Sequence, residues 1–232
     1  MNQKPKRHRY PVSIISFAVW TYHRFNDSLR DVSERLAYRG IIVSYESIRK
    51  WAKKFSKPFI NVIKKKERKP SDKWHLDEMN LKINGEKFVL WRAVDKDGME
   101  LDVFLQKRKN KKSAIRFLSR LLGSYPSPRV IVTDKLASYK RPIKNMTKAR
   151  HLRHKGLNNR AENAHQATRR KEKCLIKFKS PAHVQQTLSL MGKTRNLFSV
   201  NVGRYKNQAN ERRYQFNLSK EICDEAAQTL CA

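Results

Sequence analysis

Acidic residues are scarce in this chain, and three of them lie where a carboxylate is unexpected or well placed for chemistry. The 232 residues include 20 Asp and Glu against 53 Lys and Arg. Asp77 shares alternate positions with apolar residues in a strand-like run, and a carboxylate on an apolar face is costly unless something binds it. Asp134 ends the β-branched run Val130–Thr133, where α/β sheets present functional groups. Glu162 lies in a helical stretch, with Arg169 two turns further along the same side.

Three carboxylates of this kind can converge on a pair of Mg²⁺ ions. Hard divalent cations take oxygen ligands, and two ions about 3.5–4 Å apart can hold the attacking and leaving oxygens of an in-line phosphoryl displacement. On spacing alone, other interpretations stay open. Asp134 could instead form a turn or cap a helix. Glu162 could instead be an acid in the first turn of its helix, where it interacts favourably with the helix dipole. Asp77 has the weakest alternative of this kind, because it faces the apolar side of its strand.

Turn signals organise the chain around Asp77. Asn84-Gly85 separates the β-rich runs 74–83 and 87–94, and Asp95-Lys96-Asp97-Gly98 separates the second run from 99–106. Both are strong turn sequences when β-rich runs flank them. They predict a three-stranded antiparallel meander with Asp77 in its first strand.

The elements around the other two acids complete the predicted fold. A helix is expected from about Lys111, and the run Val130–Thr133 is typical of a short strand buried on both faces, hence parallel to a neighbour. A helix that opens at the Gly and Asn residues of 156–159 carries Glu162, and another apolar helix runs over about 182–197. Meander, helix, buried strand and further helices predict an α/β domain of the ribonuclease H type, with a mixed sheet and helices.

The first 63 residues predict a small all-α domain. One helix begins after Pro11. A second runs from about Ser28 to Arg39 and ends at Gly40, and Ser44 then caps a third. Two helices joined by a short turn after a glycine describe a helix-turn-helix. The solvent face of the third helix carries an aromatic ring and cations, at Tyr45, Arg49, Lys50, Lys53 and Lys54. These side chains suit base edges and phosphates in a major groove, and the alternative is a plain three-helix bundle with a solvated basic face.

The charge distribution divides the chain and indicates its partner. The net charge is +13 over residues 1–71, +19 over 72–200 and +1 over 201–232, for a total of +33. A chain this basic needs a polyanionic partner, and nucleic acid is the default. The run 64–71 is a charged linker that stops at a proline. We therefore predict a helix-turn-helix domain at 1–63, a basic linker at 64–71, a catalytic domain at 72–200 and a C-terminal tail at 201–232.

Composition also excludes several classes of protein. No apolar run approaches the ~18 residues that a membrane span needs, so we expect no membrane partner. Cys174, Cys223 and Cys231 form no Cys-x-x-Cys pair, which argues against a zinc site or a disulfide scaffold and favours a reduced, intracellular setting. With 22 aromatic residues (4 Trp, 8 Tyr and 10 Phe), the chain is not a disordered basic tail.

Longer motifs in the chain resemble a known family. They are Trp74–Glu78, Leu90–Gly98, Val132–Tyr139, Leu157–His165 with Arg169–Glu172, and, in the helix-turn-helix, Tyr38–Trp51. These motifs resemble the DDE transposases of bacterial insertion sequences, and the nearest match is insertion-sequence family six. The resemblance covers roughly residues 10–200 and is less distinctive beyond them.

The resemblance implies a function and a set of site residues. Asp77, Asp134 and Glu162 match the family's catalytic, metal-binding acids, for Mg²⁺ with Mn²⁺ as a substitute, and Arg169 matches a frequent basic residue. The family's enzymes bind the terminal inverted repeats of their own element, cut one strand to free a 3′-hydroxyl and join it to target DNA, commonly leaving a cointegrate. One departure is that Asp134 and Glu162 are 28 positions apart, shorter than in some members, which we interpret as a subgroup difference.

These inferences define the expected setting and the competing hypotheses. We expect double-stranded DNA as partner, a homo-oligomer (at least a dimer) in the active complex, and a place in the bacterial cytoplasm with the nucleoid. The alternative is a catalytically inactive or domesticated helix-turn-helix DNA-binding protein, such as a repressor, and the three intact acids argue against it. A basic RNA-binding protein is a third hypothesis, and the helix-turn-helix argues against that one.

Overall fold

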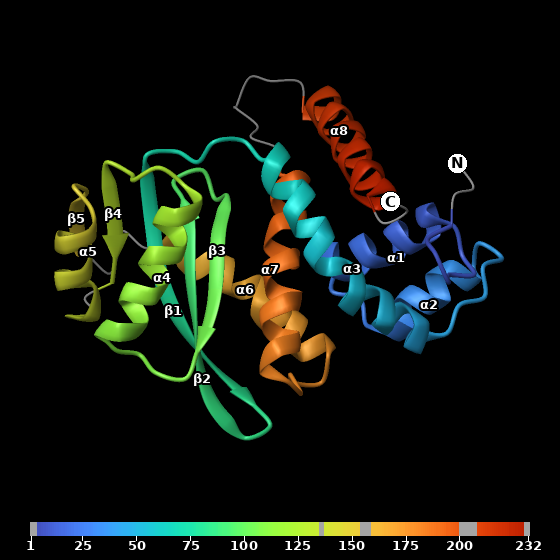
Figure 1. The fold of residues 1–232 in the computed structure, drawn as a ribbon, viewed down its shortest axis with the longest axis horizontal. Helices are drawn as coiled ribbons and strands as arrows, with labels where there is room; N and C mark the ends of the chain where they lie inside the picture. Colours follow the sequence, from blue (N-terminus) through green and yellow to red (C-terminus); the bar gives the residue numbers. More distant parts are fainter. Residues whose placement is uncertain (1–3, 135–136, 154–158, 200–207, 230–232) are drawn as a thin grey trace. The chain divides into compact units, whose positions relative to one another are not determined.

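The computed structural model describes residues 4–134, 137–153, 159–199 and 208–229 (Figure 1). The chain divides into two compact units, each described here by itself. One unit contains the residues up to Glu67 together with those from Gln186 onward, and the other runs over Arg68–Gln185. The first division falls inside the predicted linker, and the predicted boundary at residue 200 lies outside the described residues.

A mixed β-sheet forms the centre of the second unit. Its five strands, in the described part of the chain, are β1 (Lys73–Ile83), β2 (Glu86–Asp95), β3 (Glu100–Gln106), β4 (Val130–Thr133) and β5 (Arg150–Arg153). They lie in the order β3-β2-β1-β4-β5. The first three strands are antiparallel, while β4 is parallel to both β1 and β5. The predicted meander and the predicted parallel strand are therefore confirmed.

Local backbone geometry explains the hairpins. Asn84 and Gly85 have φ values of 49° and 81°, the left-handed conformation that a two-residue hairpin turn requires and that Asn and Gly adopt at little cost. Gly98 has a φ of 87° in the second turn, where Asp95 Oδ1 accepts hydrogen bonds from the backbone N–H groups of Asp97 and Met99. Met99, expected as the first residue of the third strand, lies in this turn, and β3 begins one residue later.

Helices cover both faces of this sheet. On one face, α4 (Lys111–Ser124) closes an apolar core that contains Trp74, Leu76, Trp91 and Phe117. The short helices η1 (Ala137–Tyr139) and α5 (Lys140–Met146) complete that layer. On the other face, α6 (Asn159–Cys174) packs against β1 and β2 (Figure 1). The residues 156 and 158, expected to open this helix, lie outside the described residues.

The start of α7 (Pro181–Leu197) protects the edge of the sheet. The side chain of Gln185 accepts a hydrogen bond from the N–H of Leu105 and donates one to the carbonyl of Val103, both at 2.8 Å. These bonds satisfy backbone groups that strand β3 would otherwise leave open at the edge. Strand order, strand directions and helices on both faces are those of a ribonuclease H-like fold, which confirms the predicted fold class.

The first unit contains the helical N-terminal region that the sequence predicts. Helix α1 spans Val12–Arg24, α2 spans Leu29–Ala37 and α3 spans Tyr45–Lys66. Ser28 caps α2 in a capping box with Asp31, and Ser44 caps α3 by accepting a hydrogen bond from the N–H of Ser47. Helix α3 extends three residues into the predicted linker, so Lys64, Lys65 and Lys66 are helical.

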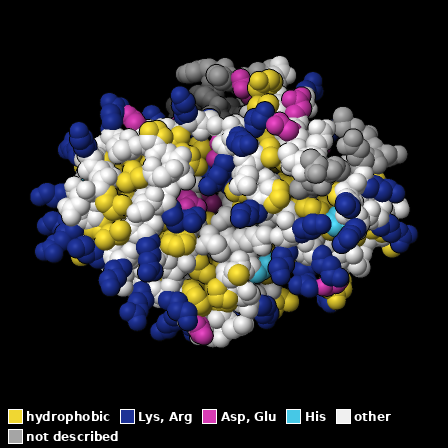
Figure 2. All heavy atoms as spheres, in the orientation of Figure 1, with side chains coloured by type: hydrophobic (Ala, Val, Ile, Leu, Met, Phe, Trp, Pro, Cys, Tyr) yellow, Lys and Arg dark blue, Asp and Glu magenta, His cyan; other side chains and the backbone are white. Residues whose placement is uncertain are grey.

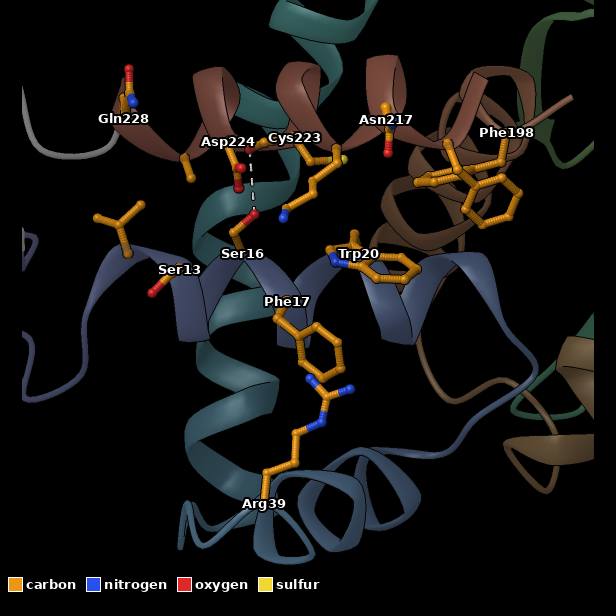
Figure 3. A pocket seen from close by; sticks show the side chains of 14 residues that line it. Ser13, Ser16, Phe17, Trp20, Arg39, Phe198, Asn217, Cys223, Asp224 and Gln228 are labelled. Carbon is orange, nitrogen blue, oxygen red and sulfur yellow. Dashed lines mark hydrogen bonds between the residues drawn. The ribbon is translucent and has the colours of Figure 1, made fainter. Parts of the chain in front are cut away.

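A further helix, α8 (Gln208–Gln228), lies in the stretch expected to be a tail. It packs against α1 and α3 through Ile222, Cys223 and Ala226, which are buried. A cavity of about 670 Å³ lies between α1 and α8 (Figure 3). There the hydroxyl of Ser16 donates to the carbonyl of Cys223 at 3.3 Å. The acids predicted for catalysis do not line it.

Basic side chains are spread over the surface of both units. Figure 2 shows Lys and Arg over much of the visible face, with few acidic side chains between them. None of the described helices is both long and apolar enough to cross a membrane.

Candidate active site

Parallel pairing of β1 with β4 brings Asp77 and Asp134 to the same level of the sheet. His75 pairs with Val132 and Leu76 with Thr133. The next residue along the chain is in each case one of the predicted acids: Asp77 lies within β1, and Asp134 directly follows the last residue of β4. Because the pairing is parallel, Asp77 lies beside the point where β4 ends and Asp134 follows, and the carboxyl end of such a strand is where this class of sheet presents functional groups.

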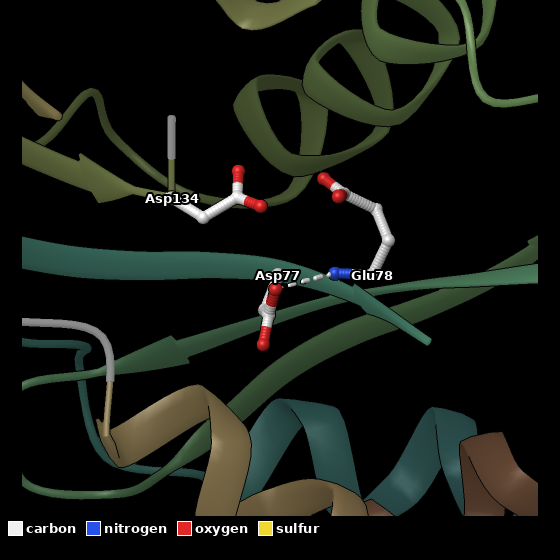
Figure 4. Close-up of side chains that lie close together, drawn as sticks. All are labelled: Asp77, Glu78 and Asp134. Atoms are coloured by element: carbon white, nitrogen blue, oxygen red, sulfur yellow. Dashed lines mark hydrogen bonds between the residues drawn. The ribbon is translucent and has the colours of Figure 1, made fainter. Parts of the chain in front are cut away.

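A third carboxylate, that of Glu78, completes a cluster in the described part of the chain. One carboxylate oxygen from each of Asp77, Glu78 and Asp134 lies within 4.8 Å of the other two. Figure 4 shows Asp134 turned toward Glu78, while Asp77 lies on the other side of strand β1. Alternation along the strand explains this arrangement, since neighbouring residues point to opposite faces. Glu78 was not predicted as a site residue from the sequence. The one available signal was that this scarce acid directly follows Asp77 in the sequence.

Burial controls the ionisation of Glu78. Its side chain is only 1% exposed, and Lys109 Nζ lies 3.0 Å from its Oε2 atom. Burial, with a contribution from the charge of Asp134, raises the pKa of the Glu78 carboxyl against the opposing effects of Tyr139 and Lys109. Burial and the Glu78 carboxylate in turn raise the pKa of Tyr139 well above its ordinary value. Glu78 therefore holds its proton more tightly than an ordinary, solvent-exposed glutamate does.

Lys109 is a cation of the described chain that faces this cluster. It lies in the loop between β3 and α4 and is partly exposed. Burial acts to lower the pKa of Lys109, but the carboxylates of Glu78, Asp134 and Asp77 outweigh that effect and raise it. The ammonium group thus partly compensates the repulsion among the acids.

Asp77 is held from two directions. Its Oδ1 atom accepts a hydrogen bond from the backbone N–H of Glu78 at 2.9 Å, and its Oδ2 atom lies 3.2 Å from Nε2 of His165 on α6. The apolar neighbours that it was predicted to share a face with, Met79, Leu81 and Ile83, are all buried. That face is the one covered by α6, whose polar His165 meets the carboxylate.

The two predicted site residues on α6 are both exposed. Glu162 lies in the first turn of the helix, one turn before His165, and is not part of the cluster of acids in the described chain. Arg169 lies two turns after Glu162, on the same helix. The roles of Glu162 and Arg169 stay predictions.

An all-oxygen donor set of this kind suits a hard divalent cation. Three carboxylates within 4.8 Å repel one another, and Mg²⁺ or Mn²⁺ between them would offset that repulsion with the ligand type it prefers. Asp77 and Asp134 are partly exposed, so a cation and a substrate can reach them. The residues present therefore fit such a metal.

The predicted DNA-binding residues are exposed on α3, while its opposite face, with Ile48, Trp51, Ala52 and Phe55, is buried. The exposed residues are Tyr45, Arg49, Lys50 and Lys53. Arg49 is not a free cation, because its Nη2 atom lies 2.5 Å from the Glu46 carboxylate one turn earlier. DNA binding through these side chains stays a prediction.

Comparison with known proteins identifies the family of this chain. A family model described as a DDE domain matches residues 71–201. The chain is 34% identical over 158 residues to the transposase for insertion sequence-like element IS431mec of Staphylococcus aureus strain Mu50. Identity is also 34% over 158 residues to the transposase for insertion sequence element IS257 in transposon Tn4003, of the same species. In both cases the match covers 66% of this chain and 70% of the relative.

Among solved structures, the simian T-cell lymphotropic virus intasome in complex with PP2A regulatory subunit B56 gamma contains a similar chain. That match has a TM-score of 0.46 and 19% identity, and it covers 63% of this chain and 57% of the other. The family model spans more than half of the present chain, and the two transposases match most of their own length. The chain belongs to the DDE transposases, in the group of insertion-sequence family six.

Proposed function

We propose that this transposase binds the terminal inverted repeats of its insertion sequence and catalyses metal-dependent cleavage and transfer of DNA strands. The observation that carries the proposal is the parallel register that places Asp77 and Asp134 side by side, with Glu78 within 4.8 Å. Joining of the freed 3′-hydroxyl to target DNA would give replicative, cointegrate-type transposition. Because its substrate is bacterial DNA, the protein would act in the bacterial cytoplasm, together with the nucleoid.

The acids and their neighbours have distinct roles in the proposed reaction. Asp77 and Asp134 hold the divalent cation, with Glu162 brought from α6 as the third catalytic acid. When bound there, Mg²⁺ or Mn²⁺ supplies Lewis acidity toward the scissile phosphate and lowers the pKa of the attacking water. The backbone N–H of Glu78 orients Asp77, and Lys109 balances the negative charge. Neither cleavage nor transfer needs a covalent protein intermediate.

Basic side chains position the DNA. Tyr45, Arg49, Lys50 and Lys53 on α3 approach the groove of the element's end, as the second helix of a helix-turn-helix does. Arg169 lies roughly 10 Å along α6 from Glu162, a distance that suits a phosphate of the bound end. Two ends and a target have to be held together for transfer, so the active complex contains at least two copies of the chain.

The test first identifies the inverted repeat by sequencing the DNA that flanks the gene, and then measures cleavage of a labelled duplex that carries this repeat. Asp77→Asn, Asp134→Asn and Glu162→Gln should each reduce nicking in Mg²⁺ or Mn²⁺ to below about one-hundredth of wild type. Binding to the duplex should stay equal or rise slightly, because a negative charge near DNA is removed. Glu86→Gln, an exposed acid of β2, is the matched control and should cleave normally.

The outcomes separate the proposed function from its alternative. Full nicking by one of the three variants would remove that residue from the site, and full nicking in EDTA would exclude the metal mechanism. Specific binding by wild type with no nicking in either metal would favour an inactive, domesticated DNA-binding protein instead.

A further inference from the structure

Arg92 is a completely buried cation on the face of the sheet that carries Asp77. The two residues are directly opposite each other on strands β2 and β1, so their side chains share that face. Arg92 Nε lies 3.1 Å from Oε2 of Glu100, and Nη2 donates a 2.6 Å hydrogen bond to the hydroxyl of Thr168. The Nη1 atom lies 3.3 Å from Nδ1 of His165. A buried charge with contacts in several directions indicates a specific role, because burial of an unpaired cation is costly.

The contact with Arg92 determines which ring nitrogen of His165 carries hydrogen. A guanidinium group has donors and no acceptor, so the Nδ1 atom that faces it has to accept. The hydrogen of the imidazole then belongs on Nε2. That atom is buried and lies 3.2 Å from Oδ2 of Asp77, close to it but outside hydrogen-bond geometry with the described residues.

We propose that Arg92 and His165 are positioning residues for Asp77. In this arrangement Arg92 holds the imidazole, and the Nε2–H group of His165, 3.2 Å from Oδ2, is the donor that Asp77 can engage when it binds a cation. The backbone N–H of Glu78 holds Oδ1 at the same time. Both oxygens are then restrained in the position from which one of them lies within 4.8 Å of a carboxylate oxygen of Asp134. Outer contacts of this kind orient metal-binding carboxylates and tune their affinity.

The same contacts set the position of α6 along the sheet. His165 and Thr168 are one helical turn apart, and both contact Arg92. Glu162 is one turn earlier, so a helix fixed at His165 and Thr168 also has a fixed position for Glu162 relative to Asp77. This consequence rests on the proposed function, in which Glu162 joins Asp77 and Asp134.

The test compares amides that replace the imidazole. In His165→Gln the amide nitrogen can reach the place of Nε2, whereas in His165→Asn it reaches only the place of Nδ1. His165→Leu removes both nitrogens, and Gln166→Leu alters an exposed neighbour on α6 as the matched control. Binding of Mn²⁺ to the metal-free, full-length proteins is measured by electron paramagnetic resonance, with thermal unfolding and strand nicking measured in parallel.

We expect His165→Leu and His165→Asn to weaken Mn²⁺ binding about 10- to 100-fold, while His165→Gln and Gln166→Leu stay within a few-fold of wild type. Nicking should follow the same order at saturating Mn²⁺. If His165→Leu does not fold, the Gln and Asn variants still test the positioning role. Both introduce a polar amide, and they differ in whether its nitrogen reaches the place of Nε2.

Two results would overturn the inference, and they are distinguishable. Equal Mn²⁺ affinity in wild type, His165→Gln and His165→Asn would show that His165 does not position Asp77 and would leave the proposed function intact. An absence of Mn²⁺ binding in wild type itself would overturn the proposed metal site, and the positioning role with it.

Discussion

At the scale of single residues, Glu78 differs from its neighbours in the acid cluster. Asp77 and Asp134 are partly open to solvent, whereas the Glu78 side chain is buried beside Lys109 and Tyr139. A carboxyl group whose pKa is raised in the folded protein binds its proton more tightly there than in the unfolded chain. Its ionisation therefore costs stability.

Glu78→Gln should consequently stabilise the protein near neutral pH. The sign follows from linkage, because stability attributable to Glu78 is fully present below the ordinary pKa of 4.5 and is lost as the pH rises through the raised value. The variant has no such group, so its advantage should grow from acidic pH toward pH 7, to on the order of 1 kcal/mol. Urea unfolding of both proteins at a series of pH values measures this advantage.

Two observations would contradict this expectation. A variant that is less stable than wild type at pH 7 would show that the ion pair with Lys109 outweighs burial. A difference that does not change with pH would show that Glu78 does not titrate differently in the folded protein. Glu86→Gln on β2, whose side chain is 63% exposed, serves as the control and should change stability little at any pH.

At the scale of elements, helix α3 carries two groups of cations at its two ends. Arg49 and Lys50 lie near the N-terminus, where a recognition helix contacts base edges, and Lys64 and Lys65 lie exposed in the last turn. The two pairs carry the same charge and lie on the same helix. Replacing one pair or the other therefore distinguishes recognition of a DNA sequence from general electrostatic attraction to DNA.

Replacement of Arg49 and Lys50 with Ala should weaken binding to the element's end by about tenfold or more, because each base contact is worth about 1–3 kcal/mol. The preference over an unrelated duplex should fall as well. Lys64→Ala with Lys65→Ala should weaken binding to both duplexes alike. Fluorescence anisotropy with labelled duplexes measures all four affinities, and unchanged end-binding by the first variant would place recognition elsewhere.

At the scale of the whole molecule, the net charge of +33 makes DNA binding dependent on salt. With six or more phosphates contacted, affinity for an unrelated duplex should fall about a thousandfold between 50 and 200 mM salt. The slope of log affinity against log salt concentration gives the number of phosphates contacted. A slope near zero would show that the basic surface does not hold DNA.

Long-range packing also decides how the chain is divided. Residues from Gln186 onward belong with the N-terminal helices, although more than a hundred positions separate them in sequence. Buried contacts such as the 2.8 Å ion pair of Lys193 with Glu67 hold them there. Helix α8 was not predicted, because its buried residues are few and weakly apolar, as with Ala226 and Ala227.

Local signals in the sequence determined most of the elements and two of the three residues that form the acid cluster. Caps at Ser28 and Ser44 and the Asn84-Gly85 turn act on neighbouring residues, so they are readable without a fold. Asp77 and Asp134 were recognisable because one lies on an apolar face and the other ends a buried strand. Their proximity follows once the strands are parallel.

The remaining features were decided only by the tertiary structure. Glu78 joins Asp134 because strand alternation and packing bury it beside Lys109, a residue 31 positions away. Arg92 meets His165 across 73 positions, and nothing in either local sequence specifies that contact. Local propensities depend on a few adjacent residues, whereas these contacts depend on which faces of separate elements become buried together.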